Sequence, residues 1–381
     1  MIFLHYYSMI ILRLNKNFKA IAIFCCVICL HIKGLYAQSC PEKDFILSVH
    51  GHYGYIMSHR NNMTHLIKGH IYGGEVNYTF RTSGDKPWQQ LYKYPDFGIC
   101  VLHLDLANPE QLGTLEAIYP YTNLRLNKLN KRINLNLRLG TGLGFLTKPF
   151  DRIKNHKNNA IGSHLNGFVN IRLSATYLLT DAWAINAGVG LTHISNGAMK
   201  TPNLGLNMAT INMGVGYVFG NRCLTYRTDS ISPCKKTWKY SILGVAGVKE
   251  LETPGGRKYM AYGLQFMGHK ILNYKNKLGG GIEFSYNNST RQEWYNDSIY
   301  NPAFTDILQV GAKFSYAYVL HKLSFPVEFG VYIFKKQDIN GMFFHRIGFR
   351  YMLTKHMIAN VTLLTHFAKA DYFEGGLGYE F

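Results

Sequence analysis

One stretch of the chain brings together side chains that could do chemistry: THISNGAMKTPNLGLN, residues 192–207. His193 and Ser195 stand two residues apart, Asn196 follows directly, and Asn207 ends the stretch. On a β-strand, side chains at positions i and i+2 share a face and can come within hydrogen-bonding reach. A serine hydroxyl is a weak nucleophile until a neighbouring base takes its proton. The pattern therefore fits either nucleophilic chemistry or the polar tip of a hairpin.

The elements that must position these residues are β-strands. Apolar and polar or small residues alternate with period two in roughly 16 segments, many of about 10 to 17 residues. Such segments exceed the ordinary strand of ~5–6 residues and reach the ~9–11 residues that cross a bilayer obliquely. Tyr, Phe and Gly are abundant, only 17% of residues are charged, and the last residues, GGLGYEF, alternate to a terminal phenylalanine. The sequence thus predicts an all-β fold, a transmembrane antiparallel β-barrel of the bacterial outer membrane with about 14–16 strands.

We expect a signal peptide over residues 1–37 and one outer-membrane barrel over residues 38–381. Basic residues precede the apolar run AIAIFCCVICL, and Ala37 ends a small-residue cleavage site. No long apolar run follows the signal, so no transmembrane helix is expected. The polar break around residues 220–235 is interpreted as a loop between strands of one barrel, with two stacked barrels as the alternative.

The chain is strongly basic, with 41 Lys and Arg against 22 Asp and Glu. Loss of residues 1–37 would remove four basic residues and no acidic one, which lowers the formal charge from +19 to +15. A charge of this size favours an anionic partner. Because the sequence has an export signal and no nucleic-acid-binding module, we expect an anionic membrane surface and no nucleic acid.

Three other motifs carry weaker signals. His50 and His52 in HGH share a strand face, but with no third ligand they are interpreted as lumen-lining residues, and no metal site is predicted. GTGLG, residues 140–144, lacks the following helix that a dinucleotide site needs. Cys223 and Cys234 flank a polar stretch in an oxidising compartment, which predicts a loop disulfide, with two free thiols as the alternative.

The alternation on both sides of the opening stretch predicts which face its polar residues occupy. In residues 181–195 the apolar side chains fall on odd positions, and His193 and Ser195 continue that face. In residues 206–219 the apolar face is again odd, so Asn207 lies on it too. Polar groups against lipid are costly unless they are partnered or lie at the interface. That cost favours a functional cluster over a hairpin tip.

Within this stretch, His-x-Ser-Asn-Gly followed by Pro-Asn-x-Gly resembles the signature of the lipid A 3-O-deacylase family (PagL-type, acyloxyacyl-hydrolase-like). The family consists of outer-membrane barrels whose lipid-facing Ser–His–Glu triad cleaves an ester-linked acyl chain from lipid A. The strand that ends at Ser195 is the seventh in our count and runs outward, toward the lipopolysaccharide of a Gram-negative outer leaflet. The better-known members have eight strands, and this chain is about twice their size.

Carried over to this chain, the resemblance implies a nucleophile, its general base and two oxyanion-stabilising residues: Ser195, His193, Asn196 and Gly197. The family's glutamate position, 12 residues after the serine, holds Asn207. An amide oxygen can still accept from the imidazole, but it cannot stabilise imidazolium by charge, and such a swap can cost about 10⁴ in rate. Either Asn207 or another acid, such as Asp151 on an external loop, would orient His193.

The resemblance implies an integral outer-membrane serine esterase, a carboxylic ester hydrolase that acts on lipid A without a cofactor or metal. Its partner would be lipopolysaccharide in the outer leaflet, and a homodimer is compatible with it. Two alternatives stay open. A pore or transport barrel of about 14–16 strands would enclose a lumen lined by Arg138 and Arg172. A catalytically silent lipopolysaccharide-binding barrel would explain the missing glutamate.

Overall fold

The computed structural model describes residues 45–129, 132–220, 226–251, 253–297, 301–337, 340–367 and 369–381. The predicted signal peptide, residues 1–37, lies outside them, and so does Cys223 of the predicted disulfide with Cys234. Within the described part of the chain, no helix is both long enough and apolar enough to cross a membrane.

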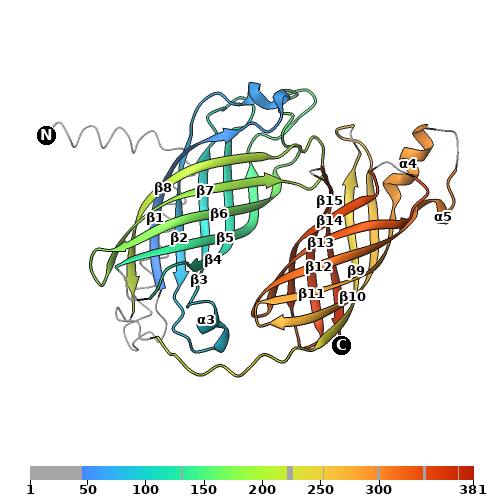
Figure 1. Ribbon diagram of the computed structural model, residues 1–381. Helices are drawn as coiled ribbons and strands as arrows, with labels where there is room; N and C mark the ends of the chain where they lie inside the picture. The colour runs from blue at the N-terminus through green and yellow to red at the C-terminus, as the bar shows by residue number, and fades with distance from the viewer. Residues whose placement is uncertain are drawn as a thin grey trace.

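Sixteen strands make up most of the described chain (Figure 1). The first eight are β1 (Phe45–Met57), β2 (Ile71–Phe80), β3 (Asp96–Asp105), β4 (Thr114–Arg125), β5 (Ile133–Leu146), β6 (Leu165–Leu178), β7 (Trp183–Ser195) and β8 (Leu206–Phe219). The second eight are β9 (Trp238–Glu250), β10 (Lys258–Asn273), β11 (Asn276–Asn287), β12 (Leu308–Leu320), β13 (Leu323–Phe334), β14 (Phe343–Met352), β15 (Met357–His366) and β16 (Lys369–Glu380). Short helices lie in the connections: η1 (Asn61–Leu66), α3 (Pro87–Leu91), α4 (Asn288–Asp297) and α5 (Phe304–Ile307).

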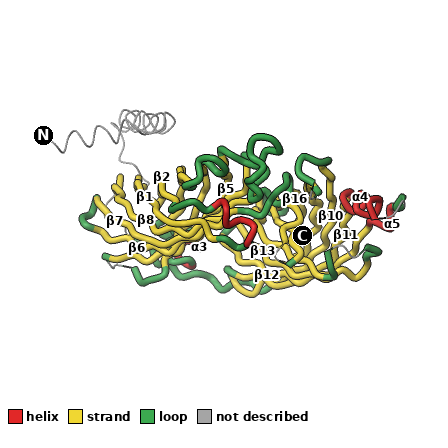
Figure 2. The backbone as a smooth tube through the Cα atoms, turned by 90° about the horizontal axis from the view of Figure 1, so that it is seen from above, coloured by secondary structure: helices red, strands yellow, loops and turns green. Residues whose placement is uncertain are grey.

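The strands close into two antiparallel barrels, β1–β8 and β9–β16, which lie side by side (Figure 1, Figure 2). β8 pairs back onto β1, and β16 pairs back onto β9. The predicted barrel class and strand number are confirmed, but the single barrel over residues 38–381 is corrected to two. The segment between β8 and β9 therefore connects two barrels and is not a hairpin loop within one. Since every strand carries the same period-two pattern, the pattern does not mark where a sheet closes on itself.

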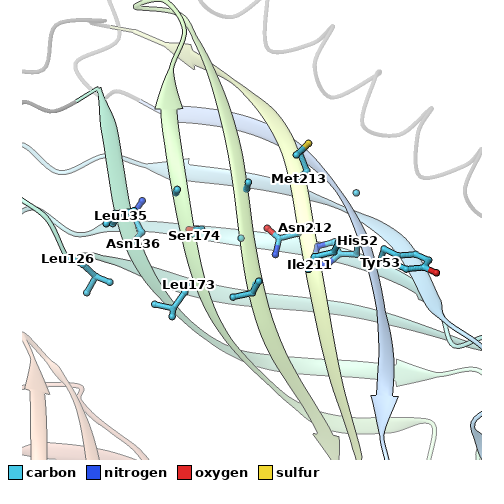
Figure 3. Close-up of a pocket in the computed structure, with 15 residues that line it drawn as sticks. His52, Tyr53, Leu126, Leu135, Asn136, Leu173, Ser174, Ile211, Asn212 and Met213 are labelled. Atoms are coloured by element: carbon cyan, nitrogen blue, oxygen red, sulfur yellow. The ribbon is translucent and has the colours of Figure 1, made fainter.

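The barrel walls show the predicted alternation of side chains. Leu173, Ile211 and Met213 are 53%, 59% and 67% exposed on the outer surface. Asn136 and Asn212 are buried on the opposite face, inside the barrel. Figure 3 shows residues of both kinds together on neighbouring strands of the first barrel. The outer surface is therefore apolar, as in a barrel surrounded by lipid, and the interior holds polar side chains together with buried apolar clusters that include Leu102, Tyr119 and Phe168 in the first barrel.

Four buried side chains of the first barrel contact one carboxylate, that of Glu75. Its carboxylate accepts hydrogen bonds from Arg172 at 2.5 and 2.6 Å and lies 3.4 Å from Nη1 of Arg138. His50 Nδ1 and His52 Nε2 lie 3.1 and 3.0 Å from the same carboxylate, so the HGH pair lines the lumen as predicted. An eight-stranded barrel is just wide enough for its side chains to fill. These buried groups fill part of the lumen, and the buried apolar cluster around Leu102, Tyr119 and Phe168 fills another part.

The second barrel fills its interior with a different set of charges. Lys313 Nζ lies 2.7 Å from Glu328 and 3.2 Å from Glu283. Arg346 lies 2.7 Å from Glu374 and also pairs with Glu283, and Arg350 lies 2.8 Å from Glu328. Each cation thus meets at least one carboxylate, and the charge is spread over three acids. A buried charge is tolerated only when it is paired in this way.

The barrels contact each other near the ends of their strands. At the α3 end, the Tyr92 hydroxyl donates to the carbonyl of Val319, and the Trp88 ring stacks on His321 with ring centroids 5.3 Å apart. At the opposite end, the β7–β8 loop meets the last residues of β9. This second contact adjoins the candidate site.

Candidate active site

The candidate site lies where β7 ends and β8 begins. His193 is directly opposite Asn207 in the register, and Ser195 is opposite Gly167 of β6. The odd-numbered residues of β7 from Trp183 to Leu191 are exposed on the outer surface, and the even-numbered ones are buried or half-buried. His193 and Ser195 continue the odd face, so they point outward, on the side that the alternation predicted.

The structure brings Ser195, His193 and Asn207 into one line of hydrogen bonds. Nε2 of His193 lies 3.0 Å from Oγ of Ser195, and Nδ1 of His193 lies 2.6 Å from Oδ1 of Asn207. Ser195 is only 8% exposed. An imidazole that donates through Nδ1 to Asn207 keeps Nε2 free to accept the serine proton, which is the geometry of a nucleophile and its general base.

His59, which follows β1, extends this line and was missed by the sequence analysis. Its Nε2 donates to the carbonyl of Leu204 at 3.0 Å, because a carbonyl can only accept. Its Nδ1 must then accept from Nδ2 of Asn207, 3.1 Å away. The amide oxygen of Asn207 is thereby turned toward His193. Only the fold brings His59 here, since it is far from the other site residues in the chain and no motif surrounds it.

Asn196 organises the loop after the nucleophile. Its side-chain Nδ2 donates to Ser163 Oγ at 2.7 Å and to the carbonyl of Lys200 at 2.8 Å. Its Oδ1 accepts from the backbone N–H of Lys200 at 3.3 Å, and its own backbone N–H donates to Asn203 Oδ1 at 2.9 Å. The side chain is completely buried. Both amide hydrogens of Asn196 are therefore engaged within the loop.

Gly197 and Ala198 make the chain turn sharply beside Ser195. Their φ angles are +59° and +60°, a conformation that L-residues rarely adopt. Gly205 is also left-handed, with φ +81°, and a side chain there would crowd Cε1 of His193. Glycine at both positions lets the loop pass closely around the histidine and the serine.

Asp151 serves its own loop. Its carboxylate accepts the backbone N–H groups of Ile153 and Lys154 at 2.9 and 2.7 Å. These hydrogen bonds, with that of Lys154 the stronger, hold the pKa of Asp151 below its usual value. The observed partner of His193 Nδ1 is Asn207 and not this acid.

Potential metal ligands are sparse. Over the part of the chain that the structure describes, no group of three or more His, Cys, Asp and Glu side chains could hold a metal ion. His50 and His52 both contact Glu75, but this carboxylate is already bound by arginines.

Comparison with known proteins distinguishes the two barrels. Residues 72–216 match the lipid A 3-O-deacylase (PagL) family, and residues 238–381 match the acyloxyacyl hydrolase C-terminal domain. The chain belongs to the PagL lipid A 3-O-deacylase family. It is an outer-membrane β-barrel protein of a family of ester hydrolases.

The remaining comparisons are more distant. No curated protein sequence matches this PagL-family chain significantly. Neisserial surface protein A is 11% identical over 47% of this chain and 97% of its own, with a TM-score of 0.32. A mutant porin of Rh. blastica is 12% identical over 88% of this chain and 100% of its own, with a TM-score of 0.18. The barrel assignment rests on the closed strand pairing described above.

The third position of the site separates this PagL-family chain from the family pattern. The pattern that the resemblance implied has a glutamate where Asn207 stands. The structure nevertheless keeps the third partner within hydrogen-bonding distance of His193. Position 207 therefore retains the geometry of an orienting residue without its negative charge.

Proposed function

We propose that this chain removes an ester-linked acyl chain from lipid A, with Ser195 as nucleophile and His193 as general base. The observation that carries the proposal is the outward-facing hydrogen bond between Nε2 of His193 and Oγ of Ser195, at 3.0 Å. Because His193 and Ser195 lie on the lipid-facing side of the barrel, their substrate would reach them from the membrane. A lipid with an ester near the headgroup fits that position.

The reaction proceeds through an acyl-enzyme. The Ser195 hydroxyl passes its proton to Nε2 of His193 while Oγ forms a bond to the ester carbonyl carbon. The tetrahedral intermediate then breaks its bond to the sugar oxygen, which leaves as an alcohol with the proton from His193. Water, deprotonated by the same imidazole, attacks the acyl-serine and releases the fatty acid. No other cofactor or co-reactant is needed.

The oxyanion is stabilised by backbone N–H groups of the turn at Gly197 and Ala198. Gly197 and Ala198 come directly after Asn196, and their left-handed conformation makes the chain turn sharply beside Ser195. Asn196 contributes by holding this turn, because both hydrogens of its side-chain amide are engaged by Ser163 and Lys200. Such preorganised donors are worth about 10²–10³ in rate.

Asn207 orients the imidazole, and His59 orients Asn207. An amide can present either its oxygen or its nitrogen, and only the oxygen fixes the imidazole tautomer that leaves Nε2 free to accept. The acceptor nitrogen of His59 selects that orientation. The chain thus replaces the charge of a glutamate with a directed hydrogen bond.

The site lies at the external rim, where basic side chains gather on the β5–β6 loop. Exposed cations on that loop are Lys148, Arg152, Lys154 and Lys157. They would attract the phosphates of lipid A. The filled interiors of both barrels speak against the pore alternative, since no wide lumen of about 14–16 strands is formed.

Mass spectrometry of lipid A from cells that express the wild-type chain or Ser195→Ala tests the proposal. We expect wild-type cells to accumulate lipid A that lacks one ester-linked acyl chain, and Ser195→Ala cells to retain it. Ser174→Ala, a half-buried residue of β6 in the same barrel, is the matched control and should deacylate normally. Identical lipid A in wild-type and Ser195→Ala cells, at equal folded protein in the membrane, would favour a silent lipopolysaccharide-binding barrel.

A further inference from the structure

The second barrel touches the loop that carries the candidate nucleophile. The carboxylate of Glu250, the last residue of β9, accepts the backbone N–H of Thr201 at 2.6 Å. The backbone N–H of Glu250 donates to the carbonyl of Ala198 at 2.9 Å. Oγ1 of Thr201 donates to the carbonyl of Leu251 at 3.2 Å. The β7–β8 loop of one barrel is thus held by three hydrogen bonds to Glu250, at the end of β9 of the other barrel, and to Leu251, the next residue.

Glu250 is an unusual choice for a mere packing contact. It is 2% exposed, although charged side chains are rarely buried unless they are paired or hydrogen-bonded. Its carboxylate accepts from a loop that begins directly after Ser195. A hydrogen bond to a charged acceptor is stronger than one between neutral groups. The hydrogen bond from the Thr201 N–H to the Glu250 carboxylate holds the loop just beyond the turn formed by Gly197 and Ala198.

Phe373 of β16 lies on the other side of this turn. Its ring packs against Gly197 so closely that any side chain there would collide with it. A Cβ at Gly167 would lie 3.2 Å from the end of the same ring. Gly167 is the residue directly opposite Ser195 in the β6–β7 register. The ring of Phe373, from the second barrel, therefore occupies the space beside Ser195 that a side chain at position 167 of β6 would otherwise fill.

Below this ring the surface of the first barrel is open. Val169, opposite His193, is 41% exposed, and Ile171 and Leu191, which pair with each other, are 47% and 55% exposed. These apolar side chains form a stripe that runs from the nucleophile toward the middle of the membrane. A straight hydrocarbon chain would lie along this stripe, with the ring of Phe373 at its upper edge.

We propose that the second barrel completes the acyl-ester site: Phe373 is the wall that determines which acyl groups reach Ser195, and Glu250 is a positioning residue for the loop behind it. This inference rests on the proposed function of Ser195. It gives the second barrel a part in substrate selection. The group selected is the acyl chain next to the ester carbonyl, where the ring admits a straight chain and excludes a branch.

Covalent labelling of the full chain tests the role of Phe373 without lipid A. The probes are two alkyl fluorophosphonates, one with a straight chain and one branched near the phosphorus, and intact-protein mass spectrometry measures the labelling rate. We expect wild type to prefer the straight probe. Phe373→Ala should raise the branched-to-straight ratio by about tenfold, the discrimination of a small apolar group in a pocket. Phe373→Trp should lower the ratio, which keeps the test valid if the smaller variant folds poorly.

The controls separate this inference from the proposed function. Phe329→Ala removes an outward-facing phenylalanine of β13 that is 53% exposed, and it should leave the ratio unchanged. Ser195→Ala should abolish labelling by both probes, and equal labelling of Ser195→Ala would overturn the proposed function. Normal labelling at Ser195 with the same ratio in wild type, Phe373→Ala and Phe373→Trp would overturn the role of Phe373 alone.

Glu250 calls for a different measurement, because it acts through the loop. Glu250→Ala should slow labelling by both probes equally, by about tenfold, as expected from one lost hydrogen bond to a charged group. Glu250→Gln keeps an acceptor for the Thr201 N–H and should recover most of the rate. Hydrogen exchange of the Thr201 amide should accelerate in Glu250→Ala and not in Glu250→Gln. Equal rates and equal exchange in all three proteins would overturn the positioning role.

Discussion

The two barrels differ in how their interiors hold charge. In the first, one carboxylate, that of Glu75, meets two arginines and two histidines. In the second, three glutamates share two arginines and one lysine, and Arg346 alone contacts both Glu283 and Glu374. Both networks lie buried in an eight-stranded lumen that also contains apolar side chains. The first depends on a single residue, and the second does not.

The outer surfaces differ more sharply. β7 ends in His193 and Ser195 on its outward face, whereas β15, the seventh strand of the second barrel, has Leu363 and Thr365 at the matching end. At the end of β15, His366 points inward, where its Nδ1 lies 3.6 Å from Asp371. His345 of β14 does face outward, but its neighbours two residues away on that face are Phe343 and Ile347. An outward-facing histidine with a serine two residues away is therefore found in β7 and at neither of these positions of the second barrel.

The largest expected effect comes from removing the base. His193→Ala should reduce the rate of deacylation by roughly 10⁴–10⁶, because losing one member of a serine–histidine unit costs nearly as much as losing all of it. His345→Ala removes a half-buried histidine on the outward face of β14 and is the matched control. Deacylation of purified lipopolysaccharide by both variants measures the difference. Equal losses of deacylation rate in His193→Ala and His345→Ala would show that the two barrels do not differ in reactivity.

The interiors should respond unequally to the loss of one acid. Glu75→Gln should destabilise the chain by about 3–5 kcal/mol, because Arg172 and Arg138 would keep their charges without a buried partner. Glu374→Gln should cost about 1–3 kcal/mol, because Arg346 retains Glu283. Denaturant unfolding of the barrels reconstituted in lipid vesicles measures both. Similar free energies of unfolding for the two variants would show that the first interior does not depend on one residue.

The rate should rise when position 207 gains a carboxylate. In the second barrel, His366 already has one beside it, that of Asp371. Asn207→Asp keeps an oxygen near Nδ1 of His193 and adds a negative charge that stabilises imidazolium in the transition state. We expect kcat to rise by about tenfold or more, a fraction of the 10⁴ lost when the triad acid becomes an amide. Asn207→Ala should lower kcat. An unchanged rate in both variants would exclude position 207 from the mechanism.

The smallest effect concerns His59. The acceptor nitrogen of His59 turns the amide oxygen of Asn207 toward His193, so a variant without an acceptor at position 59 loses this orientation. His59→Ala should therefore lower kcat by about tenfold. His59→Gln offers both an acceptor and a donor in place of the imidazole, and it should recover most of the rate. Deacylation of purified lipopolysaccharide measures both variants, and a wild-type rate in His59→Ala would show that His59 does not orient Asn207.

Local sequence was sufficient for the strands, their faces and the central pair. Period-two alternation places His193, Ser195 and Asn207 on one outward face, because side chains on a strand alternate strictly and neighbouring strands keep their register. The same alternation predicts the polar interior that holds His50 and His52. These features depend on residues close together in the chain, and so a pattern in the sequence contains them.

Only the tertiary structure decided where the sheets close and what surrounds the site. The period-two pattern is the same in all sixteen strands, so it predicts barrel walls without marking the return of β8 to β1 or of β16 to β9. His59, Glu250 and Phe373 reach the site from other strands and from the other barrel. No local pattern in the sequence predicts these three residues. Their contacts with the site depend on how the two sheets close and pack against each other, and not on the residues next to them in the chain.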